Sequence, residues 1–199
     1  MQHTVPFEHG GYYHVYNKGN NNENLFVEER NYALFLSLLK KYVLPDADIY
    51  AYCLMKNHFH LLVRINDVNA NTTSSHIARP YLGFSHALNA YTQSINNAYN
   101  RQGSLFSKYL KRIRITDETY LREVIVYIHL NPVKHGFSTG VEYPHSSYNT
   151  MISTKPTNLC RDEVIKMFGD VENFIYWHDY KKIQHLIKNE SENEHYFLE

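Results

Sequence analysis

The sequence predicts an α+β domain, a ferredoxin-like β-α-β-β-α-β sandwich with one added helix and a C-terminal helical tail. Three observations support this fold class. Four short runs rich in aromatic and β-branched residues suit strands, and longer segments repeat apolar residues at helical spacing. These segments also follow one another in the required order. At 199 residues, the chain has room for one well-cored domain and an appendage.

The first half of the chain supplies a strand, a helix and a pair of strands. Residues 10–17 are rich in aromatic and β-branched side chains and end at a polar turn, so we expect a strand there. Residues 28–44 repeat apolar side chains at helical spacing, begin with acids and end with lysines before a proline, which predicts a helix. Residues 49–55 and 58–65 are separated by only a short step, which predicts an antiparallel pair.

The second half is expected to add a helix over residues 80–100, a strand over 105–115 and the further helix over 116–129. We expect Asn131-Pro132 to mark the end region of that last helix, because the residue before a proline avoids helical geometry. A short helix is predicted over residues 162–168, where a glycine follows.

The balance of charge changes sign near residue 156, and we divide the chain there. Residues 1–156 carry 15 Lys and Arg against 11 Asp and Glu, whereas residues 157–199 carry 5 against 9. The first part is predicted to be the catalytic domain and the second an acidic tail. Four basic residues with no acid among them fall within seven positions: Lys108, Lys111, Arg112 and Arg114. Such a cluster suits phosphate binding in DNA, and a solvated strand edge is the other interpretation.

The composition limits the class of protein. A hydrophobic share of 43% with 20% charged residues is that of an ordinary globular protein. No apolar run approaches the ~18 residues that span a bilayer, and no signal peptide is visible at the N-terminus. The two cysteines form no disulfide framework, so we expect a cytoplasmic protein with no membrane partner.

His58-Phe59-His60 is the first candidate for a functional site. On a strand, side chains at positions i and i+2 share a face, and their Cα atoms lie ~6.6 Å apart. The two imidazoles can therefore converge on one divalent metal ion. The alternative is a pair of half-exposed strand histidines that make ordinary hydrogen bonds.

Tyr127 and Asn131 are the second candidate pair. They lie four residues apart on a predicted helix, so their side chains are neighbours on one side of it. Asn131 offers a carbonyl oxygen that suits a third ligand for Mg²⁺ or Mn²⁺ beside the two histidines. Tyr127 offers a phenol that can attack phosphorus. The alternatives are a packed helix tyrosine and an asparagine that caps the helix before proline.

Together these groups suit the cleavage of a phosphodiester bond. An ordinary phenol has a pKa of about 10, so it is a poor nucleophile at neutral pH. A metal ion on the scissile phosphate would polarise it and hold it in line with the phenol. The resulting phosphotyrosine would keep the energy of the broken bond, so a DNA 3′-OH could rejoin the strand without ATP. In agreement, the chain has no Gly-x-x-x-x-Gly-Lys-Ser/Thr loop.

Several longer segments carry these residues. They read Tyr13-His14-Val15-Tyr16-Asn17-Lys18-Gly19-Asn20, Ala51-Tyr52-Cys53-Leu54-Met55-Lys56-Asn57-His58-Phe59-His60-Leu61-Leu62-Val63, Tyr120-Leu121, Tyr127-Ile128-His129-Leu130-Asn131-Pro132-Val133-Lys134 and Ser146-Ser147-Tyr148. Through them, over roughly residues 10–150, the chain resembles the single-tyrosine HUH transposases of small insertion sequences. It is most similar to the branch of REP-associated tyrosine transposases.

The resemblance implies a set of residue roles and partners. The family's two metal-binding histidines, its nucleophilic tyrosine and its further polar ligand fall in that order on His58, His60, Tyr127 and Asn131. Proteins of this kind bind imperfect DNA hairpins and cleave the adjoining single strand, and a homodimer can assemble their site. DNA contacts are expected at Lys18 and Asn20, where Lys18 replaces the usual arginine and is a weaker donor for a bidentate contact.

Two other functions stay open at the level of sequence. A non-catalytic module could stack single-stranded RNA or DNA on aromatic rings, and 18 tyrosines suit that function. It would give no reason for the histidines and Tyr127 to converge. A metal-dependent hydrolase would instead use His58 and His60 to activate water. Within the transposase hypothesis, Tyr120 is the alternative nucleophile.

Overall fold

A four-stranded antiparallel sheet forms the centre of the computed structural model, which describes residues 5–67 and 80–190. The strands are β1 (Tyr12–Lys18), β2 (Ala47–Met55), β3 (His58–Ile65) and β4 (Lys111–Ile115). The helices are α1 (Glu29–Tyr42), α2 (Pro80–Ala98), α3 (Glu118–Lys134), α4 (Tyr148–Met151), α5 (Arg161–Phe168) and α6 (Val171–Glu190), with a 3-10 turn η1 (Asn20–Asn22). The strand order β2-β3-β1-β4 with antiparallel pairing is that of a ferredoxin-like fold, and the predicted fold class is confirmed.

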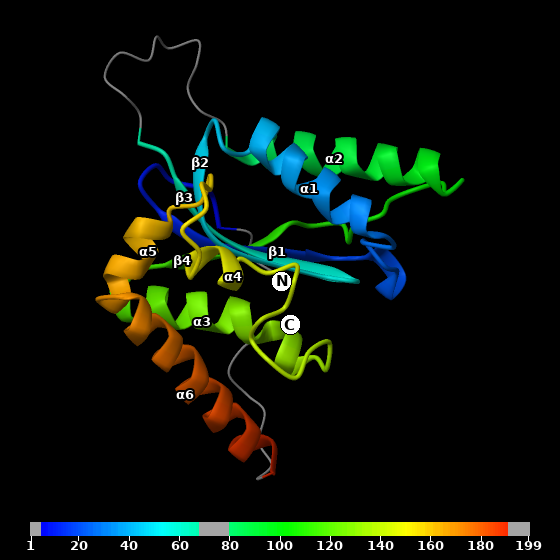
Figure 1. Cartoon of the computed structure of the whole chain (residues 1–199). Coiled ribbons are helices and arrows are strands. Elements are labelled where there is room, and N and C mark those ends of the chain that lie inside the picture. Colours follow the sequence, from blue (N-terminus) through cyan, green and yellow to red (C-terminus); the bar gives the residue numbers. More distant parts are fainter. Residues whose placement is uncertain (1–4, 68–79, 191–199) are drawn as a thin grey trace.

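Helices cover both faces of the sheet (Figure 1). The helices α1 and α2 lie on one face, where their apolar side chains Phe35 and Tyr91 pack against the sheet residues Val15 and Phe59. The added helix α3 lies on the opposite face together with α4, α5 and α6. The two cores are therefore separated by the sheet itself.

Alternation along the strands decides which side chains reach which face. On β1, Tyr13 and Val15 point toward α1 and α2, so His14 and Tyr16 point toward α3. In the β1–β3 ladder, Tyr16 lies opposite His60. The histidines of β3 therefore share a face with the polar side chains of β1.

The end predicted for α3 is wrong. The helix runs through Pro132 to Lys134 instead of ending near residue 129. Pro132 lacks the backbone donor that a helix needs at this turn. Nearby, the side-chain amide of Asn131 donates to the carbonyl oxygen of Tyr127 at 2.8 Å. The helix stops only where Gly136 adopts a positive φ of 71°, a conformation that glycine permits at helix ends.

The fourth strand is shorter than predicted, because only its last five residues form a ladder with β1. Phe106 makes one isolated bridge to Gly19, and Ser107 donates its backbone N–H to the carbonyl oxygen of Lys18. The chain then leaves the sheet before β4 begins. The other predicted helices and strands agree with the structure to within two residues at each end.

A buried network of polar side chains connects α6 to α3 and to β2. The Nδ1–H of His178 donates to the carbonyl oxygen of Phe174 at 2.7 Å, and its Nε2 lies 2.9 Å from Nδ1 of His129. His129 Nε2 lies 2.7 Å from the hydroxyl of Ser147, which accepts the backbone N–H of Tyr52. Because a carbonyl only accepts, the network has a complete set of partners when both imidazoles are neutral.

Apolar side chains of α5 and α6 belong to the hydrophobic core that α3 forms with the sheet. Val164, Phe168 and Phe174 are buried with residues of α3. The division of the chain at residue 156 stays a prediction. Within residues 5–67 and 80–190, no helix is both long and apolar enough to cross a membrane.

We expect His178 to make the free energy of unfolding depend on pH. Burial lowers its pKa to about 4, against 6.5 for an ordinary histidine, so the unfolded chain binds protons first as the pH falls. Its contribution is fully present above pH 6.5 and is lost toward pH 4, which amounts to about 2 kcal/mol between pH 7.5 and pH 5. Urea unfolding of the wild type and of His178→Phe at both pH values tests this. The free energy of unfolding of the wild type minus that of the variant should be about 2 kcal/mol smaller at pH 5 than at pH 7.5. An equal difference at both pH values would contradict the assignment.

Candidate active site

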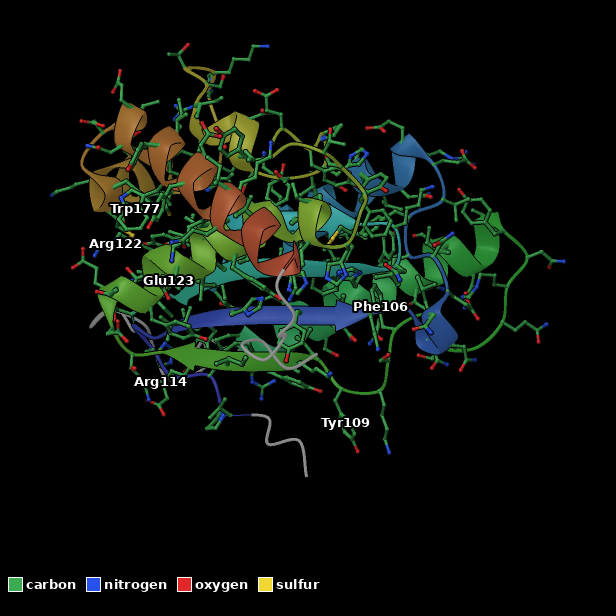
Figure 2. The ribbon with its side chains drawn as sticks, turned by 90° about the horizontal axis from the view of Figure 1, so that it is seen from below. Phe106, Tyr109, Arg114, Arg122, Glu123 and Trp177 are labelled. Atoms are coloured by element: carbon green, nitrogen blue, oxygen red, sulfur yellow. The ribbon has the colours of Figure 1, made fainter. Side chains whose placement is uncertain are left out.

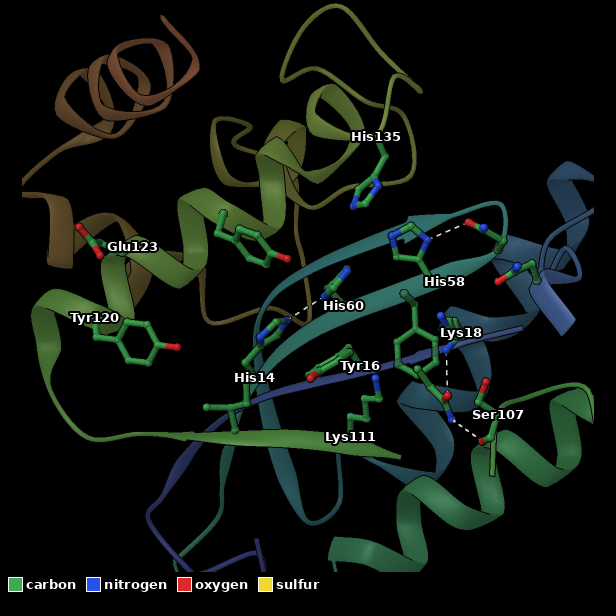
Figure 3. Close-up of a pocket in the computed structure, with 16 residues that line it drawn as sticks. His14, Tyr16, Lys18, His58, His60, Ser107, Lys111, Tyr120, Glu123 and His135 are labelled. Atoms are coloured by element: carbon green, nitrogen blue, oxygen red, sulfur yellow. Dashed lines mark hydrogen bonds between the residues drawn. The ribbon is translucent and has the colours of Figure 1, made fainter. Parts of the chain in front are cut away.

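A cleft opens on the α3 side of the sheet (Figure 3). Its volume of about 690 Å³ lies within the usual range of ligand pockets. The sheet contributes His14 and Tyr16 from β1, His60 from β3 and Lys111 from β4, and α3 contributes Tyr127. Side chains from four separate segments of the sequence thus face one space.

Tyr127 stands over the histidines of the sheet. Its ring centroid lies 5.8 Å from those of both His60 and His14, and the rings are nearly perpendicular. His58 lines the same cleft, with its ring centroid 5.3 Å from that of His60. The ammonium group of Lys134 lies 5.7 Å from the Tyr127 ring centroid. A single chain therefore brings the phenol and both candidate histidines together, without a helix from a partner.

Each candidate histidine uses its Nδ1 atom in a hydrogen bond. Nδ1 of His60 lies 2.8 Å from Nε2 of His14, and Nδ1 of His58 lies 2.7 Å from Oδ1 of Asn57 (Figure 3). In both rings, Nε2 is the nitrogen that remains for a ligand in the cleft.

Burial keeps these imidazoles neutral. It lowers the pKa of His14 to about 3 and that of His58 to about 4, and for His58 the charges of His135 and Lys18 act in the same direction. Burial, followed by the charges of its histidine neighbours, also lowers the pKa of His60 well below its ordinary value. Neutral imidazole is the form that binds metal ions.

Asn131 does not line the cleft with the histidines. Its side chain is fully buried, and Oδ1 has no hydrogen-bond partner among the residues that the structure describes. His135, which caps the C-terminal end of α3, lines the cleft instead, with its ring centroid 4.9 Å from that of His58. The predicted role of Asn131 as a metal ligand stays a prediction.

The donor atoms fit an open divalent metal site. Across the described part of the chain, no group of three or more His, Cys, Asp or Glu side chains could hold an ion. Two imidazole nitrogens, from His58 and His60, would leave several positions of Mg²⁺ or Mn²⁺ for phosphate and water oxygens. Both ions prefer oxygen ligands, which phosphate and water would supply at these positions.

Two of the predicted DNA-binding lysines line the cleft. Lys18 lies opposite His58 in the ladder, and Lys111 lies opposite Tyr16 with its ammonium 5.5 Å from the Tyr16 ring centroid. Asn20 lies just beyond β1 in η1 and does not line the cleft.

Gly19 makes the turn that follows Lys18 possible. A Cβ atom at this position would overlap the carbonyl oxygen of Glu23. The close approach explains why the motif has glycine here.

The predicted basic cluster is divided between the two faces of the sheet. Arg112 points away from Lys111 and donates to a backbone carbonyl of the N-terminal segment. Its guanidinium lies over the rings of Phe7 in that segment and of Tyr81 in α2. Arg114 pairs with Glu8 at 2.7 Å. Lys108 lies exposed in the loop before β4. Figure 2 shows its neighbour Tyr109 near the start of β4, whereas Arg114 lies near the other end of that strand. Whether these three side chains bind DNA stays a prediction.

Sequence reasoning gave no role to His14, Tyr16 or His135, which also line the cleft. Strand alternation places His14 and Tyr16 on one face with Lys18. Only the ladder register shows that this face also carries the two histidines of β3. No sequence signal marked His135.

Comparisons with known proteins place the fold. A scan with protein-family models gave no match, and a search of curated proteins gave none. A solved REP-associated tyrosine transposase bound to a REP hairpin matches with a TM-score of 0.60 and 17% identity, over 77% of this chain and 87% of that chain. The tRNA(His) guanylyltransferase of Saccharomyces cerevisiae matches with a TM-score of 0.40 and 13% identity, over 96% of this chain and 85% of that chain, which is too weak to support an argument.

The chain is therefore a ferredoxin-like α+β protein with a tyrosine-bearing helix over the strand histidines. It shares its fold with the REP-associated tyrosine transposase, and the resemblance recognised in the sequence is confirmed at the level of the fold.

Proposed function

We propose that this protein is a metal-dependent DNA transposase that cleaves and rejoins single-stranded DNA next to hairpins. Tyr127 would form the covalent 5′-phosphotyrosine intermediate. The observation that carries the proposal is the position of the Tyr127 ring, 5.8 Å from His60 in a cleft that His58 also lines. The shared fold supports it, because the matching structure is a transposase bound to a hairpin.

The nucleophile is the phenol oxygen of Tyr127. It attacks the phosphorus atom, the bond from phosphorus to the 3′ oxygen breaks, and the leaving oxygen takes up a proton to become a 3′-OH. The phenol proton passes to solvent. Lys134, which lies over the ring, favours the negative charge that develops on the phenol oxygen. Attack by a 3′-OH reverses these steps and reseals the strand.

His58 and His60 would hold the Mg²⁺ or Mn²⁺ ion, which when bound polarises the phosphate and neutralises its charge. The protein contributes two neutral rings, buried at His60 and half-buried at His58, whose Nδ1 atoms are already engaged in hydrogen bonds. We retain Asn131 as a proposed further ligand because its Oδ1 has no partner within the described residues.

The path of the single strand follows from the other side chains of the cleft. Lys18 and Lys111 are placed to bind phosphates on either side of Tyr16. Tyr16 and Tyr120 offer ring surfaces on which unpaired bases can stack. Asn20 follows Lys18 at the end of β1, where it could contact the DNA next along the path.

Tyr127→Phe should abolish the covalent adduct with DNA while leaving hairpin binding little changed, because only the attacking oxygen is removed. The assay is incubation with a labelled hairpin-flanked single strand and Mn²⁺, followed by denaturing electrophoresis. Tyr120→Phe is the matched control and should keep the adduct. Burial, with the charges of Asp117 and Glu123, raises the pKa of Tyr120, so its phenolate is disfavoured.

Three outcomes would contradict the proposal. An adduct that survives in Tyr127→Phe and disappears in Tyr120→Phe would make Tyr120 the nucleophile. Binding without any cleavage by the wild type would favour the non-catalytic binding module. Release of a free 5′-phosphate with no protein-linked intermediate would favour a hydrolase.

Lys111→Gln should weaken binding to a short unpaired oligonucleotide and flatten its salt dependence, because Lys111 faces the cleft. Loss of one phosphate contact should reduce the slope of log K against log salt by about 0.7. Arg30→Gln, in the first turn of α1 on the other side of the sheet, should leave the slope unchanged. Fluorescence anisotropy at several salt concentrations measures both variants, and equal effects would argue against the cleft as the path of the strand.

A further inference from the structure

We propose that His14 is a positioning residue that holds the ring of His60 in the form that binds the metal ion. The inference rests on the metal site of the proposed function. Its basis is the hydrogen bond of 2.8 Å between Nε2 of His14 and Nδ1 of His60, with the two rings stacked at a centroid distance of 5.0 Å.

The bond between the two rings has two alternative proton arrangements. His14 is 3% exposed and His60 is 6% exposed, and burial disfavours a charged imidazole. Two neutral rings share one proton in the bond that joins them. When His60 donates, its Nε2 keeps a free electron pair. When His14 donates, the proton of His60 sits on Nε2 and blocks a metal ion.

A metal ion in the cleft therefore requires His14 to accept. An acceptor at this position holds the proton of His60 on Nδ1, which leaves Nε2 as the ligand atom. The same pattern occurs at His58, where the partner is the side-chain oxygen of Asn57, which can only accept. With His14 as the acceptor, both candidate ligands have an acceptor behind them and Nε2 available for the cleft.

His14 gains little stability from its place in the core. Its Nδ1 atom is buried and has no hydrogen-bond partner within the described residues. An unpaired buried polar atom destabilises the folded protein, whereas an apolar ring of similar shape would avoid that cost. The presence of an imidazole at this position is therefore explained by its hydrogen bond to His60 and not by packing in the core.

The fold fixes the direction of the contact. In the ladder, His14 lies opposite Leu62, and its neighbour Tyr16 lies opposite His60. His14 is therefore a diagonal neighbour of His60 on the same face. The ring of Tyr16 stacks against the ring of His14 at a centroid distance of 5.0 Å. This packing limits rotation of the ring and keeps Nε2 aimed at His60.

The test compares His14→Phe with His14→Gln. Phenylalanine keeps a flat ring but offers no acceptor, whereas the amide oxygen of glutamine can reach about the position of the His14 Nε2 atom. Titration of the metal-free protein with Mn²⁺, followed by electron paramagnetic resonance, gives the dissociation constant without DNA or activity. His14→Phe should bind Mn²⁺ about 10- to 100-fold more weakly, and His14→Gln should restore most of the affinity.

Two further variants and a spectrum complete the experiment. His58→Ala should lose Mn²⁺ binding, and His145→Phe, a histidine outside the cleft that stacks on Tyr32, should bind like the wild type. Long-range ¹H–¹⁵N spectra of the wild type with Mg²⁺ should show the His60 proton on Nδ1, and this measurement needs no variant to fold.

The outcomes separate the two proposals. Wild-type affinity in His14→Phe, or equal weakness of the Phe and Gln variants, would overturn the role of His14 alone. A His60 proton on Nε2 in the Mg²⁺ complex would do the same. Absence of any Mn²⁺ binding that depends on His58 would instead overturn the metal site of the proposed function, and with it this inference.

Discussion

The pairing register of β1 with β3 is the constraint on which the candidate site depends. It places Tyr16 opposite His60 and Lys18 opposite His58, so that these four side chains face the cleft together. A slip of one residue would exchange the two faces of β1 and bury His14 and Tyr16 under α1 and α2. The apolar side chains of the other face prevent this, because Tyr13 and Val15 are completely buried there. The hydrophobic core thus determines the geometry of the candidate site.

The position of α3 is the second constraint, and it is set largely from the side of the helix that faces away from the cleft. Ile125 and Ile128 are completely buried in the core beneath the sheet, and His129 is tied to α6 and to the backbone of β2 through buried hydrogen bonds. Tyr127 projects into the cleft from the same turns of the helix. Apolar packing and a neutral histidine network therefore hold the phenol in place over the sheet, although neither takes part in the proposed reaction.

A local period of two or 3.6 residues was enough to predict three features. These are the order of helices and strands, the fold class and the shared face of His58 and His60. The strand period of two also places Lys111 and Arg112 on opposite faces of the sheet, so the predicted basic cluster does not form one surface. Other features depend on contacts between distant segments, which one sequence does not contain. The bond from His14 to His60 requires the ladder register. The burial of Asn131 and the approach of His135 depend on how α3 continues past Pro132, where a proline normally ends a helix.

The proposed meeting of Tyr127, His58 and His60 at one phosphate is best tested by a crystal structure of the protein with Mn²⁺ and a hairpin-flanked single strand, in which anomalous scattering locates the ion. We expect one Mn²⁺ ion bound to Nε2 of both His58 and His60 and to an oxygen of the scissile phosphate. We also expect the phenol oxygen of Tyr127 from the same chain to lie in line with the bond that breaks. An ion held elsewhere, or a scissile phosphate out of reach of Tyr127, would contradict this proposal.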